Sequence, residues 1–281
     1  MKIIAYTVSA FTAHGKGGNK AGVVLNAAML SEAQMLSIAK ALGYSETAFI
    51  TPSNVATHKV RFFTPTEEVD LCGHATVATW ALLHMQGLKP GVYSQETMAG
   101  NLGVIINGDG TVYMQQTRPH FLKKVPLKEI EIVLGINGKD FSSELEPQIV
   151  STGLQDLLVP VRDKAVLNNM KPSFEKMVKL SKHYDVTGLH VFALNGADNP
   201  VASARNFAPR VGIDEESATG TSNGALLCYL KENGTLKGDG EFCIEQGEVM
   251  DNLSFVLGKF IDGRVWVGGE AKLLQEEAFN V

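Results

Sequence analysis

The sequence has few cysteines and no long apolar run. Its three cysteines, Cys72, Cys228 and Cys243, show no CxxC pair or other metal-ligand spacing. A sparse and odd set is typical of a reducing compartment. No apolar run reaches the length of a membrane helix, and the run within residues 1–15 is interrupted by polar residues, which favours a first strand over a signal peptide. We therefore expect a cytoplasmic protein that has no part in a membrane.

The sequence also lacks a strong excess of positive or negative charge, and it lacks the common nucleotide-binding and hydrolase motifs. The net charge is −5 over 281 residues, and lysine and arginine are scattered rather than clustered. Nucleic-acid-binding proteins usually present a basic face, so we expect no nucleic acid partner. The sequence contains no Walker loop, HExxH, GxSxG or convincing GxGxxG, and the glycine-rich segment 15–18 lacks the helix and GK[ST] of a phosphate loop.

The sequence does contain a small-residue turn that leads into an apolar helix, LCGHATVATWALL at residues 71–83. A helix that is apolar nearly all round is buried. The backbone N–H groups in its first turn have no partner within the helix and form a natural anion site. We expect Gly73 and His74 to supply these donors.

A second copy of this arrangement follows in the other half of the chain. Residues 46–65 can be laid without a gap over residues 190–209, and both segments end in Arg-x-Phe-x-Pro. A second turn and apolar helix follow at 215–230, so the offset of 144 residues is about half the chain. The pattern predicts an internal duplication, with lobes at 1–118 and 119–281 and the last residues free to return to the first lobe.

Strand-like runs around one buried helix in each half predict an α+β fold. Each lobe is expected to be a mostly antiparallel sheet or barrel wrapped around its central helix. Further helices are predicted at 32–42, where Ser31 and Gln34 form a capping box and Gly43 ends the helix, and at 127–134 and 171–183.

Two helix N-termini that face one cleft between the lobes would bind an anionic group, most simply a carboxylate, without a metal. In the second half we expect the backbone at Gly220 and Thr221, together with the Thr221 hydroxyl, to contribute. The sequence thus predicts a small carboxylate-bearing substrate.

Three side chains near these turns could transfer protons. Glu46 stands at the start of an apolar strand, where a carboxylate can serve as a general base, although a strand-end glutamate that faces solvent fits the same pattern. His74 fits an orienting group, a second acid or an ordinary buried histidine. Glu216 fits a second carboxylate of the site or a solvated acid beside Glu215. Together they favour isomerisation or epimerisation beside a carboxylate.

Several motifs, in this order, resemble those of the phenazine-biosynthesis isomerase-like (PhzF) family, which shares the diaminopimelate epimerase fold. They are Gly18-Asn19 with AGVVL at 21–25, SETAF at 45–49, RFFTP at 61–65, CGHAT at 72–76 and ATGT at 218–221. The resemblance covers essentially the whole chain. It implies two pseudo-symmetric lobes, a cofactor-free site between them and a homodimer.

The resemblance also implies residue roles. Glu46 falls at the proton-shuttling glutamate and His74 at the active-site histidine, and Asn19 falls in a substrate-binding motif. Glu216 stands where the phenazine enzymes have aspartate, and Thr221 where they usually have serine. Lys20 and Ser217 each replace a proline of the family pattern. These departures leave the substrate open, because a longer carboxylate at 216 reshapes the end of the site that binds the amine.

We therefore predict a cofactor-independent isomerase, with no metal and with glutamate as acid and base. One alternative is a two-cysteine racemase, because Cys72 directly precedes Gly73. The second turn has no cysteine, however, and Cys228 lies about 10 Å or more along the helix, so we interpret Cys72 as a packing residue. Another alternative is a small-molecule binder without catalytic activity.

Overall fold

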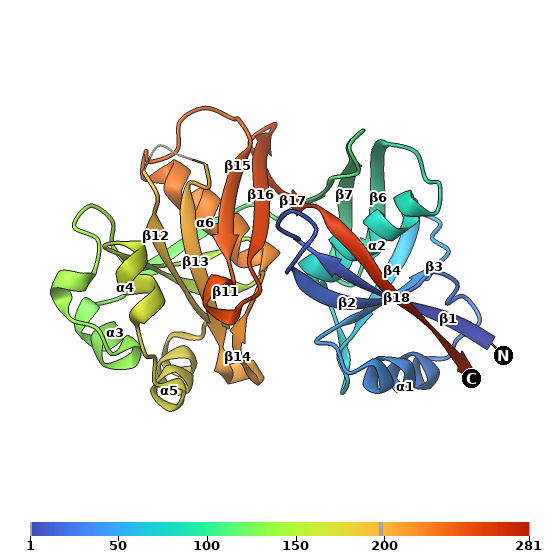
Figure 1. Cartoon of the computed structure of the whole chain (residues 1–281), viewed down its shortest axis with the longest axis horizontal. Helices are drawn as coiled ribbons and strands as arrows, with labels where there is room; N and C mark the ends of the chain where they lie inside the picture. Colours follow the sequence, from blue (N-terminus) through green and yellow to red (C-terminus); the bar gives the residue numbers. More distant parts are fainter. Residues whose placement is uncertain (1, 197–198, 281) are drawn as a thin grey trace. The chain divides into compact units, whose positions relative to one another are not determined.

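The computed structural model describes residues 2–196 and 199–280. It divides into two compact units, the first formed by Met1–Gln115 with Gly268–Val281 and the second by Gln116–Val267 (Figure 1). The lobe boundary expected after residue 118 thus lies beside the observed one. Within the described ranges, no helix is both long and apolar enough to cross a membrane. The sequence also predicts a turn at 195–198 between two strands, of which Ala197 and Asp198 lie outside the described part of the chain.

Unit 1 is a strongly bent sheet with one helix on each side. Its elements are β1 (Lys2–Ala10), β2 (Asn19–Val24), α1 (Glu32–Leu42), β3 (Thr47–Thr51), β4 (His58–Phe63), β5 (Glu68–Val69), α2 (Gly73–Met85), β6 (Gly91–Thr97), β7 (Gly100–Ile106), β8 (Val112–Gln115) and β18 (Ala271–Asn280). The strands pair in the order β18, β1, β2, β3, β4, β6, β7 and β8, and only β2–β3 and β4–β6 are parallel. Every residue of α2 from His74 to Leu82 is buried, as its uniformly apolar sequence predicts.

Unit 2 repeats the arrangement of strands around one central helix and has three further α-helices in its described residues. Its elements are β9 (His120–Lys124), α3 (Leu127–Leu134), β10 (Gln148–Ser151), β11 (Gln155–Val161), α4 (Lys164–Asn169), α5 (Phe174–Tyr184), β12 (Gly188–Leu194), β13 (Ala202–Ala208), β14 (Ile213–Glu216), α6 (Gly220–Glu232), β15 (Phe242–Gln246), β16 (Ser254–Ile261) and β17 (Arg264–Gly269). Strands β11 and β12 are parallel, as are β13 and β15, and the pairs β12–β13 and β15–β16 are antiparallel. Helix α6 follows the short strand β14 just as α2 follows β5. The predicted α+β fold with two pseudo-symmetric lobes is confirmed.

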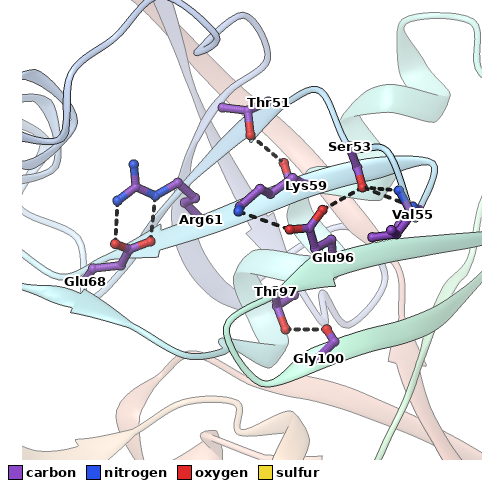
Figure 2. Close-up of polar contacts among 10 residues, drawn as sticks. Thr51, Ser53, Val55, Lys59, Arg61, Glu68, Glu96, Thr97 and Gly100 are labelled. Atoms are coloured by element: carbon purple, nitrogen blue, oxygen red, sulfur yellow. Dashed lines mark hydrogen bonds and ion pairs between the residues drawn. The ribbon is translucent and has the colours of Figure 1, made fainter.

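The repeated Arg-x-Phe-x-Pro motif forms the same structure in both units. Arg61 donates from Nε and Nη2 to the carboxylate of Glu68, at 2.7 and 2.5 Å, and its guanidinium lies 5.1 Å from the Phe63 ring centroid. Figure 2 shows this ion pair beside the contacts of Lys59 and Ser53 with Glu96. The arginine joins strand β4 to the short strand that leads into α2.

In unit 2, Arg205 donates to both carboxylate oxygens of Glu215 at 2.8 Å and lies 4.9 Å from the Phe207 ring centroid. A forked pair of this kind fixes geometry as well as charge. In each unit the motif therefore sets the path of the turn before the central helix, which is where the predicted site residues lie.

The strand register corrects the gap-free overlay of the two halves. Arg61 pairs with Phe49 across the hairpin of unit 1, whereas Arg205 pairs with Val191 in unit 2. Arg61 and Arg205 are 144 residues apart, but their cross-strand partners Phe49 and Val191 are 142 residues apart. The gap-free overlay is therefore wrong by two residues for the first strand of each hairpin.

In the corrected alignment of the two halves, Glu46 corresponds to Gly188 rather than to His190. A Cβ atom at Gly188 would lie 1.9 Å from the backbone oxygen of Phe207, so no side chain fits there. Unit 2 therefore has no counterpart of Glu46, and any carboxylate chemistry at this position belongs to unit 1.

Candidate active site

Glu46 directly precedes β3, and its backbone is fixed by the neighbouring strand. The Glu46 carbonyl accepts a hydrogen bond from Gly22 N at 3.1 Å. Its side chain is 18% exposed, and Oε2 lies 3.3 Å from His74 Nε2. That oxygen is itself buried and makes no hydrogen bond. It is thus within ion-pairing distance of the imidazole but outside hydrogen-bonding geometry, and it retains the capacity to accept a proton.

His74 lies in the first turn of α2 and is 5% exposed. The Asn19 side-chain nitrogen lies 3.3 Å from Nδ1, and Ser45 Oγ lies 3.4 Å from Nε2. An amide nitrogen only donates, so Nδ1 accepts and the neutral ring carries its proton on Nε2. The predicted residues Glu46, His74 and Asn19 are therefore brought together, with the Nε2 proton on the side of the carboxylate.

The start of α2 has no side-chain cap. Its N-cap residue is Cys72, whose side chain makes no capping hydrogen bond, and the helix begins at Gly73. Uncapped N–H groups at a helix N-terminus favour a negatively charged ligand. The predicted Gly73 donor is thus placed beside His74 at the same end of the helix.

Cys72 is a member of this cluster that we interpreted from the sequence as packing alone. It is buried, 8% exposed, but Sγ lies 3.4 Å from His74 Nδ1 and 3.9 Å from Nε2. Burial raises the pKa of Cys228 and of Cys243 to about 12, so these two thiols are inert. The Cys-x-His spacing was the available signal for Cys72, although it matches no common ligand pattern.

The second predicted segment has a hydrogen-bonded turn of its own. Thr219, the N-cap of α6, donates from Oγ1 to Glu216 Oε2 at 2.9 Å instead of capping the helix. Gln246 Nε2 donates to the Glu216 carbonyl at 2.7 Å, and Gln246 Oε1 accepts from Thr219 N at 3.2 Å. Gly220 and Thr221 open the helix, and the Thr221 carbonyl accepts from Thr152 Oγ1 at 3.1 Å. Glu216, Gly220 and Thr221 therefore lie on one ordered turn, whose substrate-binding role stays a prediction.

Below this turn lies a buried polar network that the sequence did not indicate. His190 contacts Asn206 Oδ1 through Nδ1 at 3.0 Å and Asn223 Oδ1 through Nε2 at 3.2 Å, and Asn223 donates to Gln246 at 2.7 Å. Burial lowers the pKa of His190 to about 4, although its contacts with Asn206 and Asn223 favour the charged ring. The network supports the turn from inside the unit.

Asp156 anchors the first turn of α6 and gives unit 2 a pH-dependent stability. Ser222 Oγ donates to Asp156 Oδ2 at 2.6 Å, and burial raises the pKa of Asp156 from 3.8 to about 6. Because the folded protein holds this proton more tightly than the unfolded chain, stability present below pH 4 is lost as the pH rises to about 6.

We expect Asp156→Asn to raise the free energy of unfolding at pH 8 by up to about 3 kcal/mol. The amide keeps an oxygen to accept from Ser222 without a buried charge. At pH 3.5 the variant and the wild type should differ little, because Asp156 is then protonated in both states. Urea denaturation at the two pH values measures the difference; an equal difference at both would contradict the assignment.

Comparison with known proteins covers nearly the whole chain. Residues 8–276 match the family model described as phenazine biosynthesis-like protein. An uncharacterized isomerase from Clostridium acetobutylicum is 36% identical over 235 residues, which cover 80% of this chain and 78% of the relative. The uncharacterized isomerase YddE from Escherichia coli K12 is 34% identical over 247 residues, covering 85% of this chain and 83% of the relative.

Solved structures agree with these matches. A PhzF-family protein from Bacillus anthracis superposes with a TM-score of 0.89 at 29% identity, over 100% of both chains. A hydroxyproline epimerase from Agrobacterium vitis superposes with a TM-score of 0.66 at 12% identity, over 99% of this chain and 92% of the epimerase. At that identity the second likeness shows a shared fold alone.

Proposed function

Because this chain belongs to the phenazine biosynthesis-like (PhzF) family, we propose that it is an isomerase that moves a proton on a small carboxylate-bearing substrate, with Glu46 as general acid and base. Curated relatives at 34–36% identity carry the name isomerase without a stated reaction, which supports the reaction class and leaves the substrate open. The proposed mechanism needs no cofactor, because a proton that leaves one carbon and returns to another leaves the oxidation state of the substrate unchanged.

The observation that carries this proposal is the state of Glu46 Oε2. The oxygen is buried, makes no hydrogen bond and lies 3.3 Å from His74 Nε2. A carboxylate oxygen that is shielded from water and retains accepting capacity suits proton abstraction from carbon. The His74 ring lies on the same side and can offset charge on the carboxylate while the proton is away from it.

The substrate carboxylate has a candidate partner beside this base. The uncapped first turn of α2, with the backbone N–H groups of Gly73 and His74, offers donors for an anion. In unit 2, Glu216 keeps its predicted catalytic role, and Gly220 and Thr221 keep their predicted substrate-binding roles, which rest on the sequence. The homodimer and the cytoplasmic location remain predictions of the same kind.

A racemase is the second candidate, and Cys72 is the observation that favours it. Its sulfur lies 3.4 Å from His74 Nδ1, close to the proposed base. A racemase would return the proton to the same carbon with inverted configuration, whereas an isomerase returns it to a different carbon. The position of the label and the configuration of the product therefore separate the two reactions.

We expect carbon-bound deuterium to appear in a substrate incubated with the enzyme in deuterated buffer. A panel of small amino, hydroxy and cyclic unsaturated carboxylic acids, followed by proton NMR, measures the exchange and locates the exchanged carbon. Exchange should persist after dialysis against a chelator, because no step uses a metal. Turnover that moves no hydrogen from one carbon to another, or that requires an added cofactor, would contradict the proposal.

A further inference from the structure

We propose that Glu46, Cys72 and His74 form a binding site for a thiophilic divalent cation such as Zn²⁺, and that the bound cation blocks Glu46 as a base. One ligand atom from each of these residues lies within 4.8 Å of the other two. The binding step stands on geometry and ligand chemistry alone. Only the inhibitory effect rests on the proposed function.

The three residues supply a ligand set that zinc favours. Thiolate, imidazole and carboxylate are its usual protein ligands, and three of them leave a fourth position for water. Softer thiolate ligation selects zinc over magnesium and calcium, which prefer oxygen ligands throughout. Cys72 therefore decides which class of cation the site accepts.

The spacing of the ligand atoms approaches that of a tetrahedral centre. With bonds of about 2.3 Å to sulfur and about 2.0 Å to nitrogen and oxygen, tetrahedral ligands lie about 3.6 Å apart for sulfur and nitrogen and about 3.3 Å apart for nitrogen and oxygen. His74 Nε2 lies 3.9 Å from Cys72 Sγ and 3.3 Å from Glu46 Oε2. Sγ lies closer to Nδ1, at 3.4 Å, so the Cys72 side chain has to turn toward Nε2 before the three atoms share one cation.

The unsatisfied oxygen of Glu46 is an independent sign of a missing partner. Oε2 is buried and makes no hydrogen bond, so a cation at this point would satisfy a group that the fold leaves without one. Metal binding replaces the proton of the Cys72 thiol and moves the imidazole proton from Nε2 to Nδ1. Asn19, whose amide lies 3.3 Å from Nδ1, can accept a hydrogen bond from Nδ1–H once its oxygen turns toward the ring.

The test uses the full-length protein, freed of metal with a chelator and titrated with Co²⁺, a spectroscopic substitute for Zn²⁺. We expect one Co²⁺ per chain, with a tetrahedral visible spectrum and a sulfur-to-cobalt charge-transfer band. Cys72→Ser should remove the charge-transfer band and weaken binding at least about tenfold, since loss of a direct ligand costs no less than loss of an outer-sphere partner.

Matched controls come from the two other cysteines, Cys228→Ser and Cys243→Ser, which should leave the cobalt spectrum unchanged because both thiols are buried within unit 2. Circular dichroism confirms that each variant is folded. A charge-transfer band that survives in Cys72→Ser, or a wild-type protein that binds no Co²⁺, overturns the proposed site.

Zn²⁺ then tests inhibition. We expect it to displace Co²⁺ and to stop deuterium exchange at one equivalent per chain. If the protein binds Co²⁺ but its metal-free form shows no carbon-proton exchange, the isomerase proposal is refuted and the metal site stands. If the metal-free protein shows exchange but binds no Co²⁺, the metal site is refuted and the isomerase proposal stands. Exchange that continues at full rate with Zn²⁺ bound through Cys72 refutes the block of Glu46.

Discussion

Replacing Glu46 by glutamine is expected to lower carbon-proton exchange by roughly 10²–10⁴-fold, the usual contribution of a general acid–base group. The amide has the size of the carboxylate and can occupy the same space 3.3 Å from His74 Nε2. It cannot take a proton from carbon, because its nitrogen has no available lone pair and its oxygen is a very weak base. Proton NMR in deuterated buffer measures the exchange rate of variant and wild type.

Substrate affinity should change much less than the rate. The anion-binding donors that we assign are backbone groups of the first turn of α2, which the substitution leaves in place. A large fall in kcat with a KM within a few fold of the wild type is therefore the expected pattern. A rise in KM at constant kcat would instead give Glu46 a binding role.

Glu67→Gln is a matched control in the same unit, because Glu67 is exposed and lies in the turn before β5. It changes the net charge by the same amount without touching the cluster at His74. Wild-type exchange in Glu67→Gln together with loss in Glu46→Gln places the effect at the candidate site. Wild-type exchange in both variants would contradict the assignment of Glu46.

Local signals in the sequence were sufficient for several helices. Helix α1 has the predicted capping box between Ser31 and Gln34 and ends at Gly43, whose φ of 68° is left-handed. Helix α3 spans the predicted residues 127–134. Capping and apolar periodicity involve only residues within a few positions of each other, so a linear reading captures them.

Long-range pairing was beyond the sequence. Strand β18 (Ala271–Asn280), which was not predicted, pairs along the whole of β1 near the other end of the chain. The predicted helix at 171–183 begins only at Phe174, and the short helix α4 (Lys164–Asn169) before it was missed. The two hairpins differ by two residues in cross-strand register, so the residue of unit 2 that corresponds to Glu46 is Gly188. Strands with similar apolar patterns do not specify that register.

The candidate site, too, was predictable from local signals only in part. The turn at 72–76 indicated an anion site, and it does bring Gly73 and His74 to the start of a buried helix. The side-chain directions at an N-cap and in the first turn depend on backbone dihedrals, however, and Cys72 has φ −140° and ψ 123°. Those angles bring its sulfur to 3.4 Å from His74 Nδ1, a contact that the Cys-x-His spacing in the sequence does not reveal.

Replacing Trp80 by alanine is expected to lower the free energy of unfolding by about 3–5 kcal/mol. Trp80 is fully buried on α2, and its ring centroid lies 5.4 Å from that of Tyr93 and 5.6 Å from that of His58. The substitution removes a large apolar surface and leaves a cavity. Nε1 also donates to Gln95 Oε1 at 2.8 Å, so the buried amide loses a partner as well.

Trp80→Phe separates the cost of the cavity from the cost of the lost hydrogen bond, because it keeps most of the side-chain volume and removes the donor to Gln95. We expect it to cost about 1–3 kcal/mol, and the exposed control Met29→Ala, at 80% exposure, to stay within about 0.5 kcal/mol of the wild type. Urea denaturation measures all three. A loss below about 1 kcal/mol in Trp80→Ala would show that α2 is held by other contacts.

Trp80 also tests whether the site depends on how firmly α2 is held in the sheet. His74 is one residue into the helix and Trp80 lies near its middle, so a helix that stays in place should keep His74 beside Glu46 even with a cavity beneath it. Under conditions where Trp80→Ala is still folded, the exchange rate per folded molecule should then equal that of the wild type. A lower rate in the folded variant would show that packing in the centre of unit 1 sets the distance between the imidazole and the carboxylate.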